Sequence, residues 1–452
     1  MNSLPDGPLL SFYGDDFTGS TAVLEALAFN GLDTVLFFEE PDAAMLAKAG
    51  PVRAVGLAGL SRSKSPAWMD THLPRAFASL KSVGAPLLHY KVCSTFDSAP
   101  ETGSIGKAID IGTRLVPGEC VLVLTASPHI PRWQAFGNLF AGSGGEVFRI
   151  DRHPVMMRHP VTPMSHGDLR SHLALQTSSR IGLIDLVDLK SGGAAQKLRR
   201  ERDRDAKIVL IDMVDSETLE RAGALIWQGR ATNPLVAGSQ GVEYALIEHW
   251  RRQGLLPMVQ GLPPLLPVDR IAVVSGSCSP VAAAQIAHAE KSGFHLVRVD
   301  PLLAADARAW HSEIERCGAE ALEGCRQGRD PLVYSALGPD DPSIARLEAI
   351  CHAQGCNREE ISLRLGSGLG QILDRILAET GIGRAVVSGG DSSGQACLAM
   401  GLNAVTALAP VAPGAPLCLA LSRKPYLDGL EIALKGGQMG EADFFSRAKG
   451  RR

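Results

Sequence analysis

The fold is decided first by Leu9-Leu-Ser-Phe-Tyr-Gly-Asp-Asp-Phe-Thr-Gly-Ser20. Its apolar beginning, Leu9–Tyr13, predicts a buried strand, and Gly14–Ser20 is a loop of glycine, aspartate and threonine. The next residues, Thr21–Asn30, have helical periodicity, and Gly31 ends the predicted helix. A strand, a polar loop and a helix in this order begin a βαβ unit, so the N-terminus predicts an α/β protein.

The same alternation continues along the N-terminal half of the chain. Thr34–Phe38, Leu87–Val92 and Val121–Leu124 read as buried strands, and Ile105–Leu115 reads as a helix between the last two. Short apolar runs that alternate with amphipathic helices favour a largely parallel sheet, because parallel neighbours need a crossover connection.

A proline-rich connection divides the chain. Gly261-Leu-Pro-Pro-Leu-Leu-Pro267 cannot continue a helix, and the strand–helix alternation restarts at Ile271–Val274. We therefore predict an N-terminal domain over residues 1–255, a linker over 256–269 and a C-terminal domain over 270–452. The expected fold is two α/β lobes, each with a largely parallel sheet flanked by helices, and an active site in the inter-lobe cleft.

The composition narrows the class of partner. The chain has 452 residues and a net charge of −3, which gives no reason to expect nucleic acid or an anionic membrane as partner. Its apolar runs are far shorter than the roughly 20 residues that span a bilayer. The N-terminus lacks the basic and apolar regions of a signal peptide, so a cytoplasmic location is predicted. A homodimer is the default expectation for such a fold.

Three glycine-bearing loops follow predicted strands in the C-terminal half. They are Val274-Ser-Gly-Ser-Cys-Ser-Pro280, Val387-Ser-Gly-Gly-Asp-Ser-Ser-Gly394 and Leu434-Lys-Gly-Gly-Gln-Met-Gly440. Each alone is compatible with a simple turn, but glycines let backbone N–H groups approach a polyphosphate, and serine and lysine add donors. None is a Walker A loop or a dinucleotide fingerprint. The candidate nucleotide-binding residues are Ser275, Ser277, Gly389, Gly390, Ser392, Ser393, Gly394, Lys435, Gly436 and Gly437.

Two adjacent carboxylates stand at the end of the first predicted strand. Open α/β sheets bind ligands at that position, and Asp15 and Asp16 could order a polyhydroxyl substrate there. One of them could accept the proton of the substrate hydroxyl during phosphoryl transfer. The alternative is that Asp16 is the N-cap of the following helix.

Two further polar loops are expected to line the substrate site. Lys91-Val-Cys-Ser-Thr-Phe-Asp-Ser98 supplies a cation, hydroxyls and a carboxylate, which suits an acid sugar, although a surface loop is the simpler alternative. His159-Pro-Val-Thr-Pro-Met164 predicts a rigid loop whose imidazole and hydroxyl face the substrate. The candidate substrate-binding residues are Lys91, Ser94, Thr95, Asp97, His159 and Thr162.

The combination of motifs resembles the four-carbon acid sugar kinase family over nearly the whole chain. The matching stretches are Gly14-Asp-Asp-Phe-Thr-Gly19, Lys91-Val-Cys-Ser-Thr-Phe-Asp97, Gly103-Ser-Ile-Gly106, His159-Pro-Val-Thr-Pro-Met164, Ser275-Gly-Ser-Cys-Ser279, Ser388-Gly-Gly-Asp-Ser-Ser-Gly394 and Lys435-Gly-Gly-Gln-Met-Gly440. The resemblance implies an N-terminal substrate lobe and a C-terminal lobe that binds ATP through Ser275, Ser277, Gly389, Gly390 and Gly437. The Cys-Ser-Thr-Phe-Asp stretch is similar to the 3-oxo-tetronate kinase branch.

We therefore predict a kinase that transfers phosphate from Mg²⁺-ATP to a hydroxyl of a four-carbon acid sugar of the 3-oxo-tetronate, threonate or erythronate type. Asp16, or else Asp15, is the predicted catalytic residue. The alternatives are a catalytically silent protein that binds acid sugar and nucleotide, and a nicotinamide-dependent oxidoreductase acting on similar acids. The sequence leaves open the particular sugar, the hydroxyl that is phosphorylated, the metal ligands and the oligomeric state.

Overall fold

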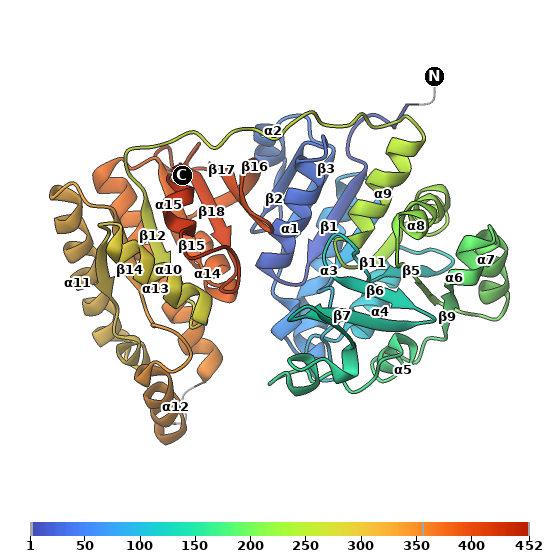
Figure 1. Ribbon diagram of the computed structural model, residues 1–452, viewed down its shortest axis with the longest axis horizontal. Helices are drawn as coiled ribbons and strands as arrows, with labels where there is room; N and C mark the ends of the chain where they lie inside the picture. The colour runs from blue at the N-terminus through green and yellow to red at the C-terminus, as the bar shows by residue number, and fades with distance from the viewer. Residues whose placement is uncertain (1–2, 355–356, 451–452) are drawn as a thin grey trace. The chain divides into compact units, whose positions relative to one another are not determined.

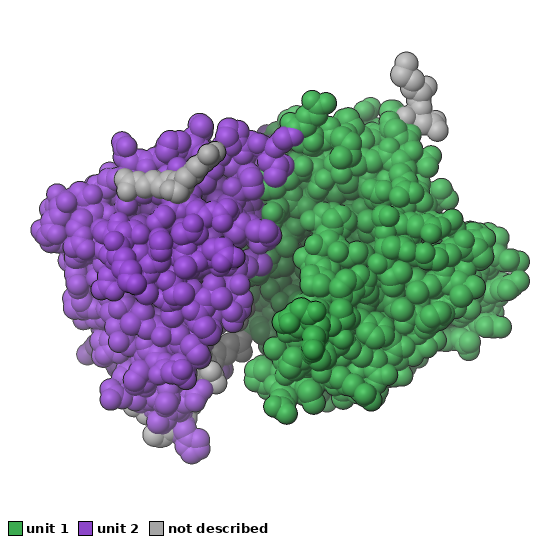
Figure 2. All heavy atoms as spheres, viewed as in Figure 1, with its two compact units in different colours: residues 1–34, 50–260 green, residues 35–49, 261–452 purple. Residues whose placement is uncertain are grey.

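The computed structural model describes residues 3–354 and 357–450, which form two compact units (Figures 1 and 2). Unit 1 contains the chain up to Thr34 together with Gly50–Gln260, and unit 2 contains Val35–Ala49 together with the chain from Gly261 onward. The change from one unit to the other at Gln260 falls inside the predicted linker. Val35–Ala49, which the sequence assigned to the N-terminal domain, belongs instead to unit 2.

Unit 1 is built on a seven-stranded parallel sheet in the order β3-β1-β4-β11-β5-β10-β9. Helix α9 packs against α8 and α1, and α3 packs with α4 (Figure 1). The elements of this sheet and its helices are β1 (Leu10–Gly14), α1 (Phe17–Ala28), β3 (Ala54–Ala58), α3 (Pro66–Ser82), β4 (Leu87–Lys91), α4 (Ile105–Leu115), β5 (Val121–Leu124), α5 (Leu169–Leu173), β9 (Ile181–Ile184), α6 (Leu186–Lys190), α7 (Ala194–Asp203), β10 (Ile208–Ile211), α8 (Ser216–Gly229), β11 (Leu235–Gly238) and α9 (Gly241–Arg252).

A small antiparallel sheet interrupts the βαβ pattern of unit 1. It is formed by β6 (Arg132–Ala135), β7 (Asn138–Ser143) and β8 (Glu146–Arg149), and the sequence analysis did not predict it. Its first turn places Phe136 at φ 50° and Gly137 at φ 81°. This turn is held by Asp212, whose buried carboxylate accepts the N–H of Gly137 at 3.0 Å.

Unit 2 has a sheet with a parallel half and an antiparallel half. The order β13-β14-β12-β15-β18 is parallel, and β17, β16 and β2 continue it in antiparallel fashion. The elements are β2 (Thr34–Phe37), α2 (Ala43–Ala49), β12 (Ala272–Ser275), α10 (Pro280–Lys291), β13 (His295–Arg298), a short 3₁₀ helix η4 (Pro301–Ala305), α11 (Ala307–Arg326), β14 (Pro331–Tyr334), α12 (Pro342–Gln354), α13 (Arg358–Thr380), β15 (Arg384–Ser388), α14 (Gly390–Met400), β16 (Leu402–Ala412), β17 (Ala415–Ser422), β18 (Glu431–Lys435) and α15 (Phe444–Ala448).

The pairing of β2 with β16 explains why an N-terminal segment belongs to unit 2. Val35 lies opposite Thr406 and Leu36 opposite Val405 in antiparallel register. The segment is also anchored through α2, where Lys48 forms an ion pair with Asp428 at 2.7 Å.

The predicted fold class is confirmed, because both units are α/β and their sheets are largely parallel. The sequence predicts helices near Gly370–Thr380 and at Gly394–Gly401. Both begin earlier in the structure, α13 at Arg358 and α14 at Gly390. Of the second glycine loop, Ser392, Ser393 and Gly394 therefore lie within helix α14 rather than in a loop. In the described part of the chain no helix is both long and apolar enough to cross a bilayer.

Candidate active site

The two acidic residues lie at a topological switch point of the unit 1 sheet. The chain leaves β1 for β3 on one side and then returns to β4 on the other side of β1. Gly14 at the end of β1 is therefore level with Lys91 at the end of β4. Ligands of open α/β sheets bind at such points, and Asp15 and Asp16 follow directly after Gly14.

Asp16 caps helix α1, as the alternative interpretation predicted. Its Oδ1 accepts the N–H of Gly19 at 2.8 Å, and the helix begins at Phe17, not at Thr21. Gly19 leaves room for both side chains, because a Cβ there would lie 2.5 Å from Lys91 Nζ and would overlap the Asp16 carboxylate unless these groups moved. The Asp16 carboxylate and the Lys91 ammonium therefore converge on the first turn of α1.

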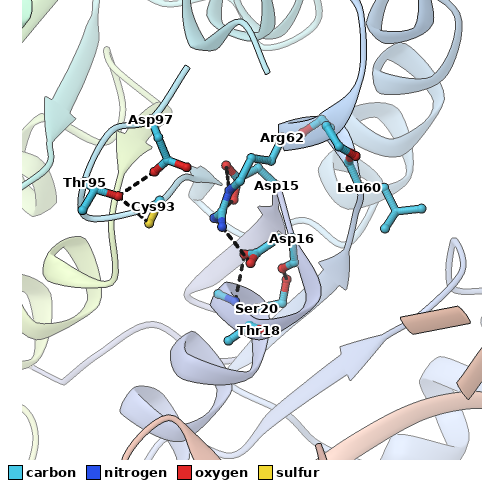
Figure 3. Close-up of polar contacts among 12 residues, drawn as sticks. Asp15, Asp16, Thr18, Ser20, Leu60, Arg62, Cys93, Thr95 and Asp97 are labelled. Atoms are coloured by element: carbon cyan, nitrogen blue, oxygen red, sulfur yellow. Dashed lines mark hydrogen bonds and ion pairs between the residues drawn. The ribbon is translucent and has the colours of Figure 1, made fainter. Parts of the chain in front are cut away.

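Arg62, which belongs to none of the predicted site motifs, joins the two carboxylates. Its Nε and Nη2 donate to the two oxygens of Asp15 at 3.1 and 2.7 Å. Its Nη1 and Nη2 donate to the two oxygens of Asp16 at 2.8 and 2.9 Å (Figure 3). One guanidinium thus holds both acids in fork geometry. The position of Arg62 could have indicated its role, because it follows shortly after the buried strand β3. The carboxyl ends of parallel strands share one edge of a sheet, so Arg62 lies near the end of β1 and hence near Asp15 and Asp16.

Burial and the neighbouring charges together shift the pKa values of Asp15 and Arg62. Burial raises the pKa of Asp15, and the neighbouring Arg62 only partly offsets this effect. Burial opposes the charge of Arg62 as well, yet Asp15 and Asp16 together raise the pKa of the guanidinium well above its usual value. The side chain of Asp16 is 18% exposed and that of Asp15 only 4%, so Asp16 is the carboxylate that a ligand can reach.

Lys91 is the last residue of β4 rather than part of the loop after it, and it is 2% exposed. In the following loop the Thr95 hydroxyl donates to Asp97 Oδ1 at 2.6 Å and lies 3.0 Å from Cys93 Sγ (Figure 3). Burial would raise the pKa of Asp97, but the charge of Arg62 lowers it below its usual value. Arg62 therefore acts electrostatically on three carboxylates.

The loop after β4 has an unusual backbone conformation. Phe96 is fully buried and has φ 57°, a left-handed conformation that is strained for a bulky residue. Two residues further on, Ser98 stabilises this conformation, because its Oγ donates to the Phe96 carbonyl at 3.0 Å and lies 2.9 Å from His172 Nε2. Gln176 Nε2 also donates to Ser98 Oγ at 2.9 Å. The loop that carries Thr95 and Asp97 is thus fixed by a buried polar network.

His159 and Thr162 form a local pair. His159 Nδ1 accepts the Thr162 N–H at 3.0 Å and lies 3.0 Å from the Thr162 hydroxyl. Among the described residues no hydrogen bond or ion pair joins this pair to the Arg62 cluster. The structure therefore brings Asp15, Asp16, Lys91 and Asp97 together around Arg62, whereas the role of His159 and Thr162 stays a prediction.

The glycine loops of unit 2 also meet at a switch point. From β12 the chain runs to β13 and β14 on one side and then to β15 on the other. Ser275 at the end of β12 is paired with Ser388 at the end of β15, and Ser388 with Lys435 at the end of β18. All three predicted loops therefore leave the same edge of the sheet at neighbouring strands.

These loops are packed so closely that only glycine fits at their contacts. A Cβ on Gly437 would collide with Ser277 Oγ, and a Cβ on Gly276 would lie 2.6 Å from Ser392 Oγ. Ser279 Oγ donates to the Gly437 carbonyl at 2.5 Å and so links the first loop to the third. Ser275 is fully buried, and its hydroxyl has no hydrogen-bond partner in the part of the chain that the structure describes. A buried hydroxyl without a partner at this edge suits a ligand that accepts a hydrogen bond.

Lys435 supplies a cation beside these loops. It is 1% exposed, and its Nζ donates to Ser388 Oγ at 2.9 Å. Burial lowers its pKa to about 8. A lysine in this environment gains from an anion placed next to it, because the anion stabilises its charged form.

The geometry defines a two-unit α/β protein with an arginine-clamped pair of carboxylates in one unit and three glycine-bearing loops beside a buried lysine in the other. Family models match both parts, a sugar-binding N-terminal domain over residues 10–246 and a nucleotide-binding C-terminal domain over residues 272–445. The chain belongs to the four-carbon acid sugar kinase family.

Individual relatives cover nearly the whole chain. This chain is 49% identical to the 3-oxo-isoapionate kinase of Paraburkholderia graminis, and the match covers 98% of this chain and 95% of that protein. It is 29% identical to the 3-oxo-tetronate kinase of Cupriavidus necator, with 99% of this chain and 98% of that protein covered. A crystal structure of a Haemophilus influenzae protein, HI1011, has the same fold at a TM-score of 0.72 and 23% identity, covering 97% of this chain and 99% of that one.

Proposed function

We propose that this chain uses ATP to phosphorylate a hydroxyl group of a small 3-oxo acid sugar. The relative with 49% identity is named for 3-oxo-isoapionate and those near 29% for 3-oxo-tetronate, so an isoapionate-type substrate is the first to test. The cytoplasmic location and the homodimer stay predictions.

The observation that carries the proposal is the Arg62 clamp on Asp15 and Asp16. Both oxygens of each acid are held by one guanidinium, so the carboxylates cannot rotate freely. Asp16 is the more exposed of the two, and it stands beside the Lys91 ammonium. A hydroxyl bound at Asp16 would give up its proton to a fixed carboxylate, while Lys91 attracts the carboxylate of the acid sugar.

The other half of the reaction belongs to the glycine loops of unit 2. Their backbone N–H groups, the Ser275 hydroxyl and the Lys435 ammonium would hold the phosphates of ATP and stabilise the charge that develops during transfer. In phosphoryl transfer such positioning and electrostatic stabilisation supply most of the catalysis.

Mg²⁺ is expected to accompany ATP. Among the described residues no group of three or more histidine, cysteine or acidic side chains could hold a metal ion. In kinases Mg²⁺ is commonly bound by substrate phosphate oxygens and water together with one or two carboxylates. When bound, the ion would neutralise charge on the phosphates.

The test is the Asp16→Asn variant. Asparagine is also a good N-cap, so helix α1 should keep its capping bond while the base is lost. We expect kcat for the acid sugar to fall by about 10²- to 10⁴-fold, the range for removal of a general base, with the ATP affinity unchanged. Asp215→Asn is the matched control, because Asp215 caps α8 in the same unit. Wild-type turnover by Asp16→Asn would refute the assignment of the base.

A further inference from the structure

The Gly103-Ser-Ile-Gly106 motif takes no part in the reaction proposed above, yet its two glycines meet groups around the loop after β4. This loop, residues 93–98, is hereafter the substrate loop. A Cβ on Gly103 would lie 2.3 Å from the carbonyl oxygen of Arg62. A Cβ on Gly106 would lie 2.8 Å from the backbone carbonyl oxygen of Gln176. The start of α4 can therefore approach both the arginine clamp and Gln176 closely because the motif has glycine at these positions.

Ser98 is the polar centre of the substrate loop, and every hydrogen-bonding position of its hydroxyl is filled. The hydroxyl donates its hydrogen to the Phe96 carbonyl at 3.0 Å. Its oxygen therefore accepts from His172 Nε2 at 2.9 Å and from Gln176 Nε2 at 2.9 Å. A hydroxyl has one hydrogen to donate and two lone pairs, so this set of bonds is complete. Because Ser98 is 1% exposed, solvent does not replace a partner that is lost.

The three bonds hold a backbone conformation that the loop does not favour by itself. Phe96 is fully buried at φ 57°, which a bulky residue rarely adopts. Such strain persists only where the surrounding contacts fix it. Ser98 fixes the Phe96 carbonyl, and the rings of Phe96 and His172 meet edge to face with their centroids 6.1 Å apart. Without these contacts Phe96 would return to negative φ, and Thr95 and Asp97 on either side of it would turn away.

The residues that support the substrate loop are themselves anchored. His172 belongs to α5, and this helix is joined to the small antiparallel sheet because the Leu169 N–H donates to the Gly137 carbonyl at 2.9 Å. Gln176 follows α5, and its Oε1 accepts the N–H of Gly106 at 3.2 Å. The support therefore extends from the small sheet through α5 to the glycine motif at the start of α4.

The substrate loop and the arginine clamp respond differently when this support is lost. The Thr95 hydroxyl donates to Asp97, and the charge of Arg62 lowers the pKa of Asp97 (Figure 3). A loop that turned away would remove Thr95 and Asp97 from a bound acid sugar. Asp15 and Asp16 would stay clamped by Arg62, because their bonds do not involve the loop. Loss of the support should therefore weaken acid-sugar binding more than the transfer step.

We infer that Ser98, His172 and Gln176 are positioning residues that keep the substrate loop in its ligand-binding conformation. The inference rests on the proposed function, because it assumes that this loop binds the acid sugar. It assigns these three residues no contact with the substrate. If only chains with a correctly placed loop bind, the apparent KM equals the intrinsic value divided by the fraction of such chains.

The first test compares the kinetics of His172→Phe and His172→Gln in the full chain. Phenylalanine keeps a flat ring but has no donor, whereas glutamine can present an amide N–H to Ser98. We expect the KM of His172→Phe for the acid sugar to rise about tenfold, as for a competent fraction of about one tenth. Its kcat should stay within about threefold of wild type, and both constants of His172→Gln should do the same.

His249→Phe is the matched control. His249 is a buried histidine of the same unit, and its Nδ1 lies 3.1 Å from Glu220 Oε1, so this variant loses a comparable contact away from the loop. Its KM for the acid sugar should equal that of wild type. The variant Ser98→Ala should raise this KM as His172→Phe does. The double variant Ser98→Ala/His172→Phe should raise it no further than Ser98→Ala alone, because His172 acts through Ser98.

Hydrogen exchange measured by mass spectrometry provides a second readout that needs no substrate. Peptides that contain residues 93–98 should exchange faster in His172→Phe and in Ser98→Ala than in wild type. Peptides from β12 in the other unit should exchange at the wild-type rate in both variants.

Three results would overturn the inference. The first is a wild-type KM and wild-type exchange in His172→Phe, and the second is an equal rise of KM in His172→Phe and His172→Gln. The third is an equal rise of the KM values for ATP and for the acid sugar, which would indicate general damage to the chain. A wild-type chain that phosphorylates no 3-oxo acid sugar would overturn the proposed function, whereas unchanged exchange of the substrate loop in both variants would overturn this inference alone.

Discussion

The buried Lys435 should make ATP binding depend on pH. Its pKa in the free chain is about 8, because burial disfavours the charged form. If ATP binds the protonated form, the apparent Kd scales as one plus the ratio of neutral to charged lysine. That factor is about 1.1 at pH 7 and about 11 at pH 9, so the Kd should rise about tenfold over this interval.

The Lys435→Met variant should lose this dependence. A hydrogen bond to a charged group contributes about 1.5–3 kcal/mol, so the variant should bind ATP about 10- to 150-fold more weakly at pH 7. Its Kd should then stay constant up to pH 9. Titration with a non-hydrolysable ATP analogue at pH 7, 8 and 9 measures both effects, with Lys291→Met, an exposed lysine of the same unit, as control.

The same pKa affects stability with a defined sign. The unfolded chain holds this proton up to the ordinary lysine value of 10.5, whereas the folded chain releases it at about 8. The unfolded state binds more protons between these values, so the contribution of Lys435 to folding improves as the pH rises from about 8 to 10.5.

The prediction for ATP binding would be refuted by a wild-type Kd that is the same at pH 7 and pH 9. It would also be refuted if the Kd of Lys435→Met changed with pH as steeply as that of the wild type.

Three further perturbations test the described contacts. Arg62→Met should lower the free energy of unfolding by about 3 kcal/mol, because it leaves two carboxylates without their partner. In urea titrations the double variant Arg62→Met/Asp15→Asn should lose less free energy of unfolding than the sum of the two single variants. Strict additivity would contradict the clamp. Gly437→Ala forces a Cβ against Ser277 of the first glycine loop. We expect this overpacking to lower the free energy of unfolding by about 1–3 kcal/mol and to weaken ATP binding. A normal KM for ATP would be the contrary result. Burial lowers the pKa of His172 to about 4, so the unfolded state takes up the proton first as the pH falls. The free energy of unfolding should therefore decrease from about pH 6.5 to pH 4. In His172→Phe this decrease should be smaller by up to about 3 kcal/mol, and an equal decrease in both proteins would exclude His172 as its source.

Local patterns in the sequence predicted most of the strands, helices and loops of the fold. The apolar run before Gly14, the acidic loop and the helix after it are neighbours in the chain, so their order could be predicted from periodicity alone. The three glycine loops were found for the same reason, since each follows a short strand that is buried on both faces. Proline and glycine between residues 261 and 267 marked the division of the chain.

Helix lengths were harder to predict where glycine is used for packing. Helix α13 runs through Gly366, Gly368 and Gly370, residues that locally favour a loop. A Cβ on Gly368 would lie against the Trp310 ring, and a Cβ on Gly370 would lie 2.5 Å from the Ala396 carbonyl. These glycines permit the close approach of neighbouring helices, which no local pattern reveals.

The sequence by itself determined the α/β class and the positions of the acidic and glycine loops at the ends of buried strands. Only the tertiary structure decided that Arg62 holds Asp15 and Asp16, and that Val35–Ala49 belongs to unit 2. The physical reason is that short-range patterns report backbone conformation and burial. Contacts between residues far apart in the chain, such as Arg62 with Asp15 or β2 with β16, depend on how strands are ordered within a sheet.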